Sequence, residues 1–372
     1  MRFPEFAGEW QDTTLGNVCV YRKTRRTAEK KNYISTENIL QNYQGVERFT
    51  SNESISGDGF NKNDILMGNI RPYLKKVYYA DFDGVCNADV LVFKSNFINP
   101  HFLYCRLAND TFINYVMKSV KGSKMPRGDK SHIMQYPLSI PGEAEQSKIS
   151  NFIELLTSRI QVQNKIISKY ETLIKGIYHE FFSKPADYAI KIKDLIIKGK
   201  SGGTPSSTVA RYYNGDIPFL SISDMTKQGK YVSYTEKHIS KSGIENSSAW
   251  IVPSNSLIFS MYASVGLVCI NTVPLATSQA MFSMVLKDRR MIEYIYYYLN
   301  FFRETKIHRH IETGTQSNIN AEIVRNIDIP FQSNHLKLVE TLNSIEKRLN
   351  NEKDMLSLLL DLKAYLLSKL FI

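Results

Sequence analysis

Hydrophobic positions follow the spacing of a coiled coil over one long stretch of this chain. Between residues 149 and 181, apolar residues recur at 149, 152, 156, 160, 167, 170, 174, 177 and 181, in steps of three and four with one gap at Gln163. This heptad spacing predicts a single long helix with one apolar stripe. Pro141 stands at its start, and Glu143 and Glu145 suit the positive end of the helix dipole.

The same helical segment occurs twice. Residues 140–182 and 329–371 both begin with Ile-Pro, end in Phe and differ by 189 positions. The predicted seam residues are Ile149, Leu156, Ile160, Gln163, Ile167, Ile174 and Ile177 in the first copy, and Leu338, Ile345, Leu349, Glu352, Leu356, Leu366 and Leu370 in the second. Because two related halves pack about a two-fold axis, we expect antiparallel helices with Gln163 opposite Glu352. That pair either forms a polar layer that fixes register or faces solvent.

The segments outside the helices mix strand-like runs with turns. The runs "DVLVFK" (89–94), "SLIFSM" (256–261) and "AMFSMVL" (280–286) predict strands, and residues 100–120 and 289–311 predict helices. A weaker likeness pairs "DILMGNIRP" (64–72) with "NSLIFSMYA" (255–263), which extends the repeat. The predicted fold class is therefore α+β. Its four parts are globular domains at 1–140 and 185–330 and long helices at 141–184 and 331–372.

Charge points to a polyanionic partner. The formal net charge is +11, and the basic surplus lies mainly in the two globular domains. No apolar run approaches the roughly 18 residues needed to span a membrane, and the N-terminus lacks a signal-peptide core. The four cysteines are far apart in the sequence, which favours reduced thiols over a zinc site or a disulfide framework. We therefore expect a cytoplasmic protein.

Loops that combine cations with hydroxyl and amide side chains are the expected contacts to DNA, since cations hold phosphates and polar groups reach base edges. A solvated surface is the alternative for each of them. The candidates in the first domain are Arg22, Lys23, Arg25, Arg26, Arg71, Lys121, Ser123, Lys124, Arg127 and Lys130. Those in the second are Lys198, Lys200, Ser201, Thr204, Ser223, Lys227, Lys306, His308, Arg309, Thr315, Gln316 and Asn318.

One of these loops, "KGKSGGTPSS" (198–207), contains the Gly-Lys-Ser that ends a P-loop. A P-loop also needs a glycine five residues before Gly199, where this chain has Asp194. The residues that follow would have to open a helix, but Gly-Gly-Thr-Pro predicts a turn. We therefore expect a flexible cationic loop suited to a DNA backbone and not a nucleotide site.

The whole chain resembles the specificity subunit of type I restriction–modification systems. The resemblance is carried by "SGGTPSS…YYNGDIPFLSISDM" (201–225), "IPGEAEQSKI" (140–149) and "GTQSNINAEIVRNIDIP" (314–330), in the expected order before the repeated helices. It implies two target-recognition domains that read the halves of a split DNA site, with the helices setting the gap between them. It also implies that the helices bind methyltransferase (modification) subunits, two of them, and through these the restriction subunits. S-adenosylmethionine, ATP and Mg²⁺ would then be bound by those partners, with no cofactor and no metal in this chain.

The chain departs from the family pattern in three places. The second repeat has Asn334-His335 where the first has Glu145-Gln146, and Lys363 where the first has Ile174. The two ends of the helices are therefore not expected to contact partners identically. The first domain has "CVYRKTRR" where the second has its Gly-Gly-Thr-Pro loop, so the target should be asymmetric.

Catalysis by this chain is the main alternative, and the sequence does not favour it. A methyltransferase of DNA amino groups needs an Asn/Asp-Pro-Pro-Tyr/Phe segment, and the nearest match is Asn99-Pro100-His101. A metal-dependent nuclease needs paired carboxylates and a lysine, which Asp12 with Glu29-Lys30-Lys31 matches only loosely. His308 and His310 lie in a basic segment and favour surface or phosphate contacts over metal binding. A stand-alone DNA-binding protein without enzyme partners stays a second alternative.

Overall fold

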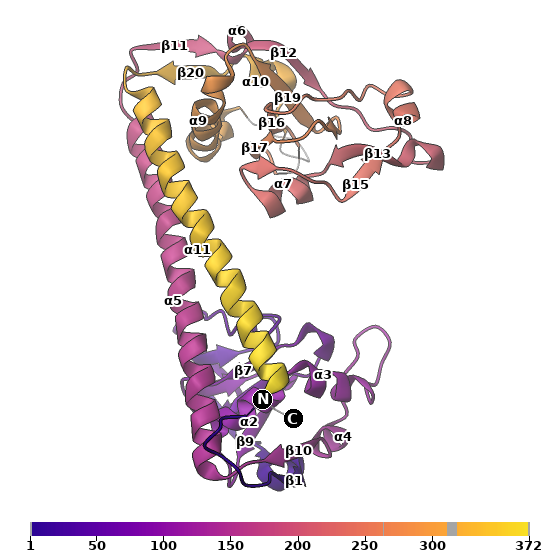
Figure 1. Cartoon of the computed structure of the whole chain (residues 1–372), viewed down its shortest axis with the longest axis vertical. Helices are drawn as coiled ribbons and strands as arrows, with labels where there is room; N and C mark the ends of the chain where they lie inside the picture. Colours follow the sequence, from indigo (N-terminus) through magenta and orange to yellow (C-terminus); the bar gives the residue numbers. More distant parts are fainter. Residues whose placement is uncertain (1, 263, 311–317, 371–372) are drawn as a thin grey trace. The chain divides into compact units, whose positions relative to one another are not determined.

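Residues 2–262, 264–310 and 318–370 are described by the computed structural model. The chain divides into two compact units, one of residues 1–165 with 352–372 and one of residues 166–351 (Figure 1). Each long helix contributes one part to each unit, so each globular domain includes the end of a long helix in its own packing.

The first unit contains three antiparallel or mixed sheets with the strand orders β2-β9-β6-β7, β3-β5-β8-β4 and β1-β10. Its strands are β1 (Gln11–Thr14), β2 (Cys19–Tyr21), β3 (Arg25–Glu29), β4 (Tyr33–Ile34), β5 (Ser54–Phe60), β6 (Ile65–Gly68), β7 (Val77–Tyr79), β8 (Gly84–Cys86), β9 (Val90–Ser95) and β10 (Pro137–Ile140). Its helices are α1 (Leu15–Val18), η1 (Lys30–Asn32), η2 (Pro72–Leu74), α2 (Pro100–Leu107), α3 (Asp110–Met117), α4 (Lys130–Met134), the first part of α5 (Glu143–Phe182) and the last part of α11 (His335–Lys369).

The second unit has a similar plan, with the five-stranded order β12-β19-β16-β17-β14, the three-stranded order β15-β13-β18 and the pair β11-β20. Its strands are β11 (Tyr188–Lys191), β12 (Ile196–Ser201), β13 (Tyr213–Leu220), β14 (Tyr231–Val232), β15 (Lys237–Ile239), β16 (Leu257–Ser260), β17 (Val268–Asn271), β18 (Ala276–Thr277), β19 (Met281–Leu286) and β20 (Asp328–Phe331). Its helices are the last part of α5, α6 (Ile192–Leu195), η3 (Ala210–Tyr212), α7 (Ile222–Gln228), α8 (Lys241–Glu245), η4 (Arg289–Met291), α9 (Ile292–Thr305), η5 (Ile307–Arg309), α10 (Ala321–Arg325) and the first part of α11.

Hydrogen-bond register corrects the likeness drawn between 64–72 and 255–263 by one residue. Asn63 and Asn255 are both left-handed, with φ of 72° and 58°, and each stands two residues before the equivalent strand, β6 or β16. The repeats therefore differ by 192 here. A left-handed asparagine and the pairing of the strands decide the register, and residue likeness alone does not reveal them.

The helix predicted over 100–120 is two helices, α2 and α3. The helix breaks at Asn109, whose backbone is extended and whose side chain accepts a hydrogen bond from Thr111 N. An N-cap of this kind starts a new helix because it satisfies an otherwise unpaired amide. The second predicted segment, 289–311, is α9 with a short 3₁₀ turn at each end.

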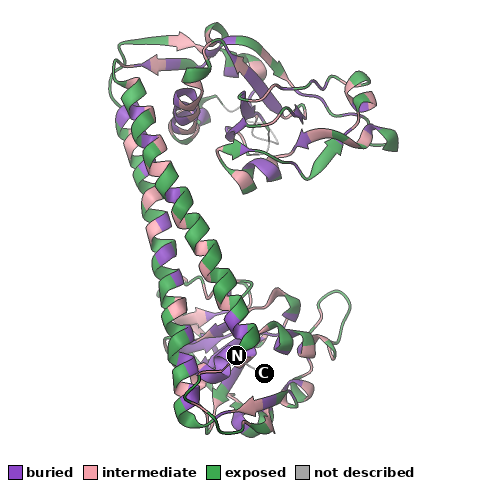
Figure 2. Ribbon diagram, viewed as in Figure 1, coloured by how far each residue is buried: buried purple, intermediate pink, exposed green. Residues whose placement is uncertain are grey.

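A buried stripe runs along each long helix, opposite a broad exposed face (Figure 2). Buried seam residues are Ile149, Ile160, Gln163, Ile167, Ile174, Leu338, Leu349, Leu366 and Leu370, and half-buried ones are Leu156, Ile177, Ile345, Glu352 and Leu356. Phe152 is 39% exposed and packs edge-on against Phe3, so its assignment to the stripe was wrong. Ile153 and the equivalent Leu342 are fully buried instead. With Ile153, the seam positions 149, 153, 156, 160, 163 and 167 alternate in steps of four and three, which is strict heptad spacing, whereas Phe152 interrupts it.

The structure places Gln163 against Glu352, where α5 and α11 run antiparallel within the first unit. Gln163 is fully buried, and its side-chain amide donates to the Glu352 carbonyl at 3.0 Å and to the Glu352 carboxylate. The Gln163 Oε1 atom is buried with no hydrogen-bond partner in the described part of the chain. A polar layer that is only partly satisfied lowers stability and favours one register over others, so we keep the register-fixing role as a hypothesis.

The family-pattern pair Glu145-Gln146 lies inside the first unit. Glu145 is buried and forms a bidentate ion pair with Arg2, at 2.7 and 2.8 Å. Gln146 accepts from Asn99 N at 2.9 Å and donates to Pro141 O at 2.8 Å. In the second repeat, the His335 ring packs edge-on against Tyr294 and Phe331 instead. This difference therefore changes how each helix is attached to its own globular domain.

The four cysteines are buried and unpaired. Burial raises the pKa of Cys19, Cys86 and Cys105 to about 12, so these thiols stay protonated at neutral pH. A protonated buried thiol is a poor nucleophile, and packing explains these residues.

Candidate nucleic-acid interface

The first candidate surface is a hairpin at residues 121–127. Lys121 and Arg127 exchange both backbone hydrogen bonds at 2.9 Å, and Gly122 takes the positive φ of 92° that the turn requires. Asp129 follows and caps α4 by accepting from Ser131 N and His132 N. The hairpin therefore stands on a fixed base and exposes Ser123 and Lys124 at its tip.

Two cations of this hairpin already have carboxylate partners. Lys121 lies 2.5 Å from Asp129, and Arg127 lies 3.1 Å from Asp89. Hydrogen bonds from Lys121 and from His132 N lower the pKa of Asp129 to about 2, so this carboxylate is charged at neutral pH. Lys124 and Lys130 are exposed and form no ion pair within the described residues, so they are the better phosphate contacts here.

The hairpin packs against the turn that follows β6. Arg71 N donates to Pro126 O at 2.8 Å, and Arg71 is left-handed with φ of 51°. Such strain persists where the surrounding structure enforces it, often at functional sites. Tyr73, two residues on, is 49% exposed. In the second domain, the segment before α10 is likewise hydrogen-bonded to the turn after β16: Ile319 N donates to Met261 O at 3.1 Å. The neighbouring Tyr262 is exposed. The prediction included Arg71 and missed both tyrosines.

Arg25 and Arg26, which were predicted to lie in a loop, lie on a strand, β3. Lys23, Arg25 and Arg26 are exposed, and Arg26 donates to Asn61 at 2.7 Å. Arg22 differs from them, because its guanidinium is half-buried and lies 2.6 Å from the buried Asp64. We leave Arg22 out of the proposed interface, since contact with DNA would require breaking this buried pair.

Two of the predicted loops in the second domain have regular structure. Lys198, Lys200 and Ser201 lie on β12, and Lys198 stands 4.2 Å above the Trp250 ring. Ser223 and Lys227 lie on α7, which Ser221 and Asp224 cap reciprocally, and Lys227 pairs with Glu236. Strand and helix were hidden because lysine, serine and glycine carry little periodic signal.

The remaining candidates of the second domain surround η5. Lys306 is half-buried against the Tyr298 and Phe301 rings, and His308 and Arg309 are exposed. Thr204 is exposed and donates to Gln279 at 2.5 Å. Asn318 is half-buried, whereas Thr315 and Gln316 lie outside the described residues.

The glycine pair after β12 serves close packing. Gly202 N donates to Met281 O at 3.1 Å and Gly203 N donates to Thr277 O at 2.9 Å. Neither amide is therefore free to hold a phosphate, and the expectation of a flexible loop here was wrong. A Cβ at Gly202 would lie 2.0 Å from Thr277 O, so no larger residue fits.

Replacing Gly202 by alanine is expected to destabilise the second domain by about 1–3 kcal/mol, because the added methyl group overlaps a backbone oxygen. The matched control is Gly176→Ala in α5, where no atom lies within 4 Å of the added Cβ. We expect that change to stabilise by about 0.5–1 kcal/mol through helix propensity. Thermal unfolding followed by circular dichroism measures both, and midpoints that move together would contradict the packing explanation.

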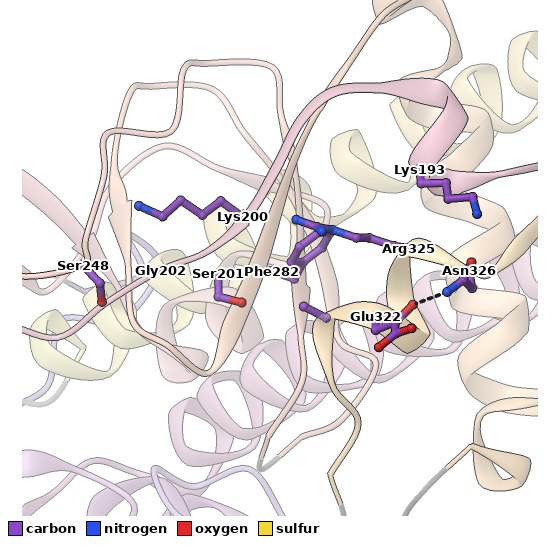
Figure 3. Close-up of a pocket in the computed structure, with 10 residues that line it drawn as sticks. Lys193, Lys200, Ser201, Gly202, Ser248, Phe282, Glu322, Arg325 and Asn326 are labelled. Atoms are coloured by element: carbon purple, nitrogen blue, oxygen red, sulfur yellow. Dashed lines mark hydrogen bonds between the residues drawn. The ribbon is translucent and has the colours of Figure 1, made fainter.

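A cavity of about 780 Å³ lies beside β12 (Figure 3). Lys200 and Ser201 reach it from β12, Lys193 from α6 and Arg325 from α10. The other lining residues are Gly202, Ser248, Phe282, Ala321, Glu322 and Asn326. Sequence reasoning found Lys200 and Ser201 and missed Lys193, Ser248 and Arg325, because residues far apart in the chain meet here only through the fold.

The occurrence of two similar domains, each followed by a long helix, agrees with comparison to known proteins. A family model described as "Type I restriction modification DNA specificity domain" matches residues 7–172 and again residues 186–356. This chain belongs to the type I restriction–modification DNA specificity family. The specificity subunits of these systems are their non-catalytic DNA-recognition components, which accounts for the lack of catalytic motifs noted in the sequence. Asn99, in the segment nearest to a methyltransferase motif, caps α2.

Relatives of this specificity family include two curated proteins. The chain is 22% identical over 451 aligned positions to the HindI specificity subunit of Haemophilus influenzae, which covers 94% of the chain and 98% of that protein. It is 28% identical over 174 residues to the MjaIX specificity subunit of Methanocaldococcus jannaschii, covering 45% of the chain but only 40% of that protein.

Two solved structures share the fold. One comes from a study of complex assembly and conformational transition of the type I R-M system, with a TM-score of 0.58, 17% identity and 98% coverage of both chains. The other is the S subunit of such a system from M. genitalium, with a TM-score of 0.58, 14% identity and coverage of 100% and 99%. Among the described residues, no helix is long and apolar enough to cross a membrane.

Proposed function

We propose that this chain is the DNA sequence-specificity subunit of a type I restriction–modification complex and recognises a bipartite, asymmetric site. Residues 1–140 and 185–330 are the two recognition domains. The observation that carries this proposal is one sheet plan occurring twice, with a matching pair of joined loops in each copy. Different side chains on those loops support different half-sites, since base edges are read by side chains and the backbone of DNA carries no sequence.

The long helices are the proposed docking surface for methyltransferase subunits, two per chain, and through them for the restriction subunits. Large apolar side chains stay exposed on these helices after each has packed in its own unit. They are Phe152, Leu155, Val162 and Leu173 on α5 and Leu336, Met355, Leu358, Leu360, Leu362 and Tyr365 on α11. Exposed apolar surface of this kind marks a protein interface and favours an assembled complex over a stand-alone DNA-binding protein.

The chemistry of the complex is assigned to those partners. We propose that the methyltransferase subunits bind S-adenosylmethionine and that the restriction subunits bind ATP and Mg²⁺. The buried, unpaired cysteines support a reducing compartment, so we propose that the complex acts on DNA in the cytoplasm.

Co-expression with the cognate methyltransferase subunits, followed by genome-wide methylation mapping, tests the function. We expect one methylated motif with two specified parts separated by unspecified bases. Replacing Leu358 and Leu362 by glutamate is expected to abolish methylation by preventing assembly, while the purified chain still binds DNA. Complete methylation with that variant would contradict helix docking, and a chain that never directs methylation but still binds DNA would support the stand-alone alternative.

A further inference from the structure

Strand pairing establishes which residues of the two domains are equivalent around the cavity. Tyr21 of β2 pairs with Phe93 of β9, and Gly199 of β12 pairs with Met284 of β19. Phe93 and Met284 pair in turn with the first residues of β6 and β16. The next residues along the edge strands, Arg22 and Lys200, therefore occupy the same position in the two domains.

These two equivalent cations have different surroundings. Arg22 is neutralised by the buried carboxylate of Asp64, at 2.6 Å. Asp64 directly follows the left-handed Asn63, and its equivalent after the left-handed Asn255 is a serine, Ser256. Ser256 is fully buried and carries no charge, so the second domain lacks the carboxylate that neutralises the cation in the first. Lys200 lines the cavity instead.

The other two cations of the cavity also replace uncharged residues. Leu15 N donates to Tyr136 O at 2.9 Å and Ile192 N to Ile327 O at 3.0 Å, so α1 and α6 are anchored alike. The next residue is Gly16 in α1 and Lys193 in α6.

The equivalent helices α4 and α10 also differ by an uncharged residue in the first domain and a cation in the second. Asp129 caps α4, and Asn320 caps α10. The last turn of these helices carries Met134 in the first domain and Arg325 in the second. Gly16 packs directly on Met134: a Cβ added at Gly16 would lie 3.4 Å from the Met134 Cβ. Apolar contact in one domain is therefore replaced by two cations in the other.

The three cations are left without carboxylate partners. Neither Lys193, Lys200 nor Arg325 forms an ion pair in the described ranges of the chain, and Glu322 is the single carboxylate among the lining residues. Arg325 is held in place, because its guanidinium donates to Gly199 O at 2.6 Å and stands 5.5 Å from the Phe282 ring centroid. Figure 3 shows the Arg325 guanidinium between the two lysines, with the amines of Lys193 and Lys200 pointing away from each other. Three cations that line one cavity without carboxylate partners favour the binding of an anion there.

We propose that this cavity binds backbone phosphate of DNA at the second half-site and that the first domain has no such site. This inference rests on the proposed function and adds a site to it. Direct contacts with phosphate would come from Lys193, Lys200 and Arg325, with Ser201 and Ser248 as hydroxyl donors. The two domains then hold DNA unequally, the second with more of the salt-dependent part of the affinity.

The test measures affinity of the full chain for a random-sequence DNA duplex across a series of salt concentrations. Lys193→Gln, Lys200→Gln and Arg325→Gln are each expected to reduce the slope of log K against log salt by about one. Near 0.1 M salt each should weaken binding about five- to tenfold. Lys347→Gln, an exposed lysine on α11 outside the globular domains, removes the same charge and should leave the slope unchanged.

The other possible results separate failure of the cavity proposal from failure of the proposed function. Wild-type slopes in all three cavity variants would overturn the cavity proposal and leave the proposed function standing, whereas a wild-type chain that binds no DNA would overturn both. Inorganic phosphate that raises the thermal midpoint of the wild type but not of the variants, with unchanged slopes, would make the cavity a site for a small free anion. The motif methylated by the complex should keep both halves in every variant, and a changed second half would show base contact in place of phosphate contact.

Discussion

Exchanging residues 1–140 for the corresponding domain of another specificity subunit is expected to change one half of the methylated motif and leave the other half intact. Each domain has its own sheets and its own pair of joined loops, so no base-reading side chain is shared between them. Methylation mapping of the exchanged complex measures the result. A motif in which both halves change would contradict independent recognition.

The structure also shows what such an exchange must preserve. The end of α5 belongs to the core of the first domain, because Glu145 pairs with Arg2 and Gln146 accepts from Asn99 N. A donor domain without an arginine at the position of Arg2 leaves a buried carboxylate unpaired, which costs about 3–5 kcal/mol. The matched control is the same donor with that arginine restored. We expect it alone to give full methylation of the hybrid motif.

Replacing Lys230 by methionine is expected to destabilise the second unit by about 3–5 kcal/mol. Only 9% of this side chain is exposed, and its ammonium lies 2.6 Å from Glu346 on α11 and 3.4 Å from Glu293 on α9. It also donates to the Tyr297 hydroxyl at 2.9 Å. Removing the cation leaves two carboxylates close together without compensation. Hydrogen exchange of the α9 amides measures the loss in this unit directly.

Two controls separate this effect from the loss of any ion pair. Lys227→Met removes the pair with Glu236, in which both side chains are 54% exposed, and should cost less than about 1 kcal/mol. Adding Glu346→Gln to Lys230→Met should restore much of the stability, since one uncompensated charge is then gone. A loss below about 1 kcal/mol for Lys230→Met would show that the network is solvated.

The same network predicts a pH dependence. Burial raises the pKa of Glu293, but hydrogen bonds from Tyr231 and Asn343 and the charge of Lys230 outweigh it, and the pKa ends below its ordinary value of 4.5. A carboxyl group with a lowered pKa in the folded state stabilises that state above pH 4.5, and this contribution is lost as the pH falls through the folded-state value. The difference between wild type and Lys230→Met should therefore shrink in acid.

The sequence identified basic residues but not their partners, because local composition describes charge alone. Lys200 and Arg22 look alike in sequence, each within a basic run. One faces a cavity and the other a buried aspartate forty-two residues away, a pairing that exists only once the strands are in register. The Gly202-Gly203 pair was predicted to form a flexible loop, but it allows close backbone packing. Glycine is typical of both situations, so the sequence does not distinguish them.

The sequence by itself determined the repeat, the two long helices, the α+β class and the family, because apolar spacing and repeated motifs are local properties that survive without coordinates. Tertiary structure alone decided that Ile153 and Leu342 lie in the seam, that Glu145 and Lys230 attach helices to their domains, and that three cations line one cavity. These depend on which distant residues become neighbours. Whether a lysine is buried and whether a carboxylate lies near it decide whether it stabilises the fold or stays available to a ligand. Neither property can be read from the residues next to that lysine in the sequence.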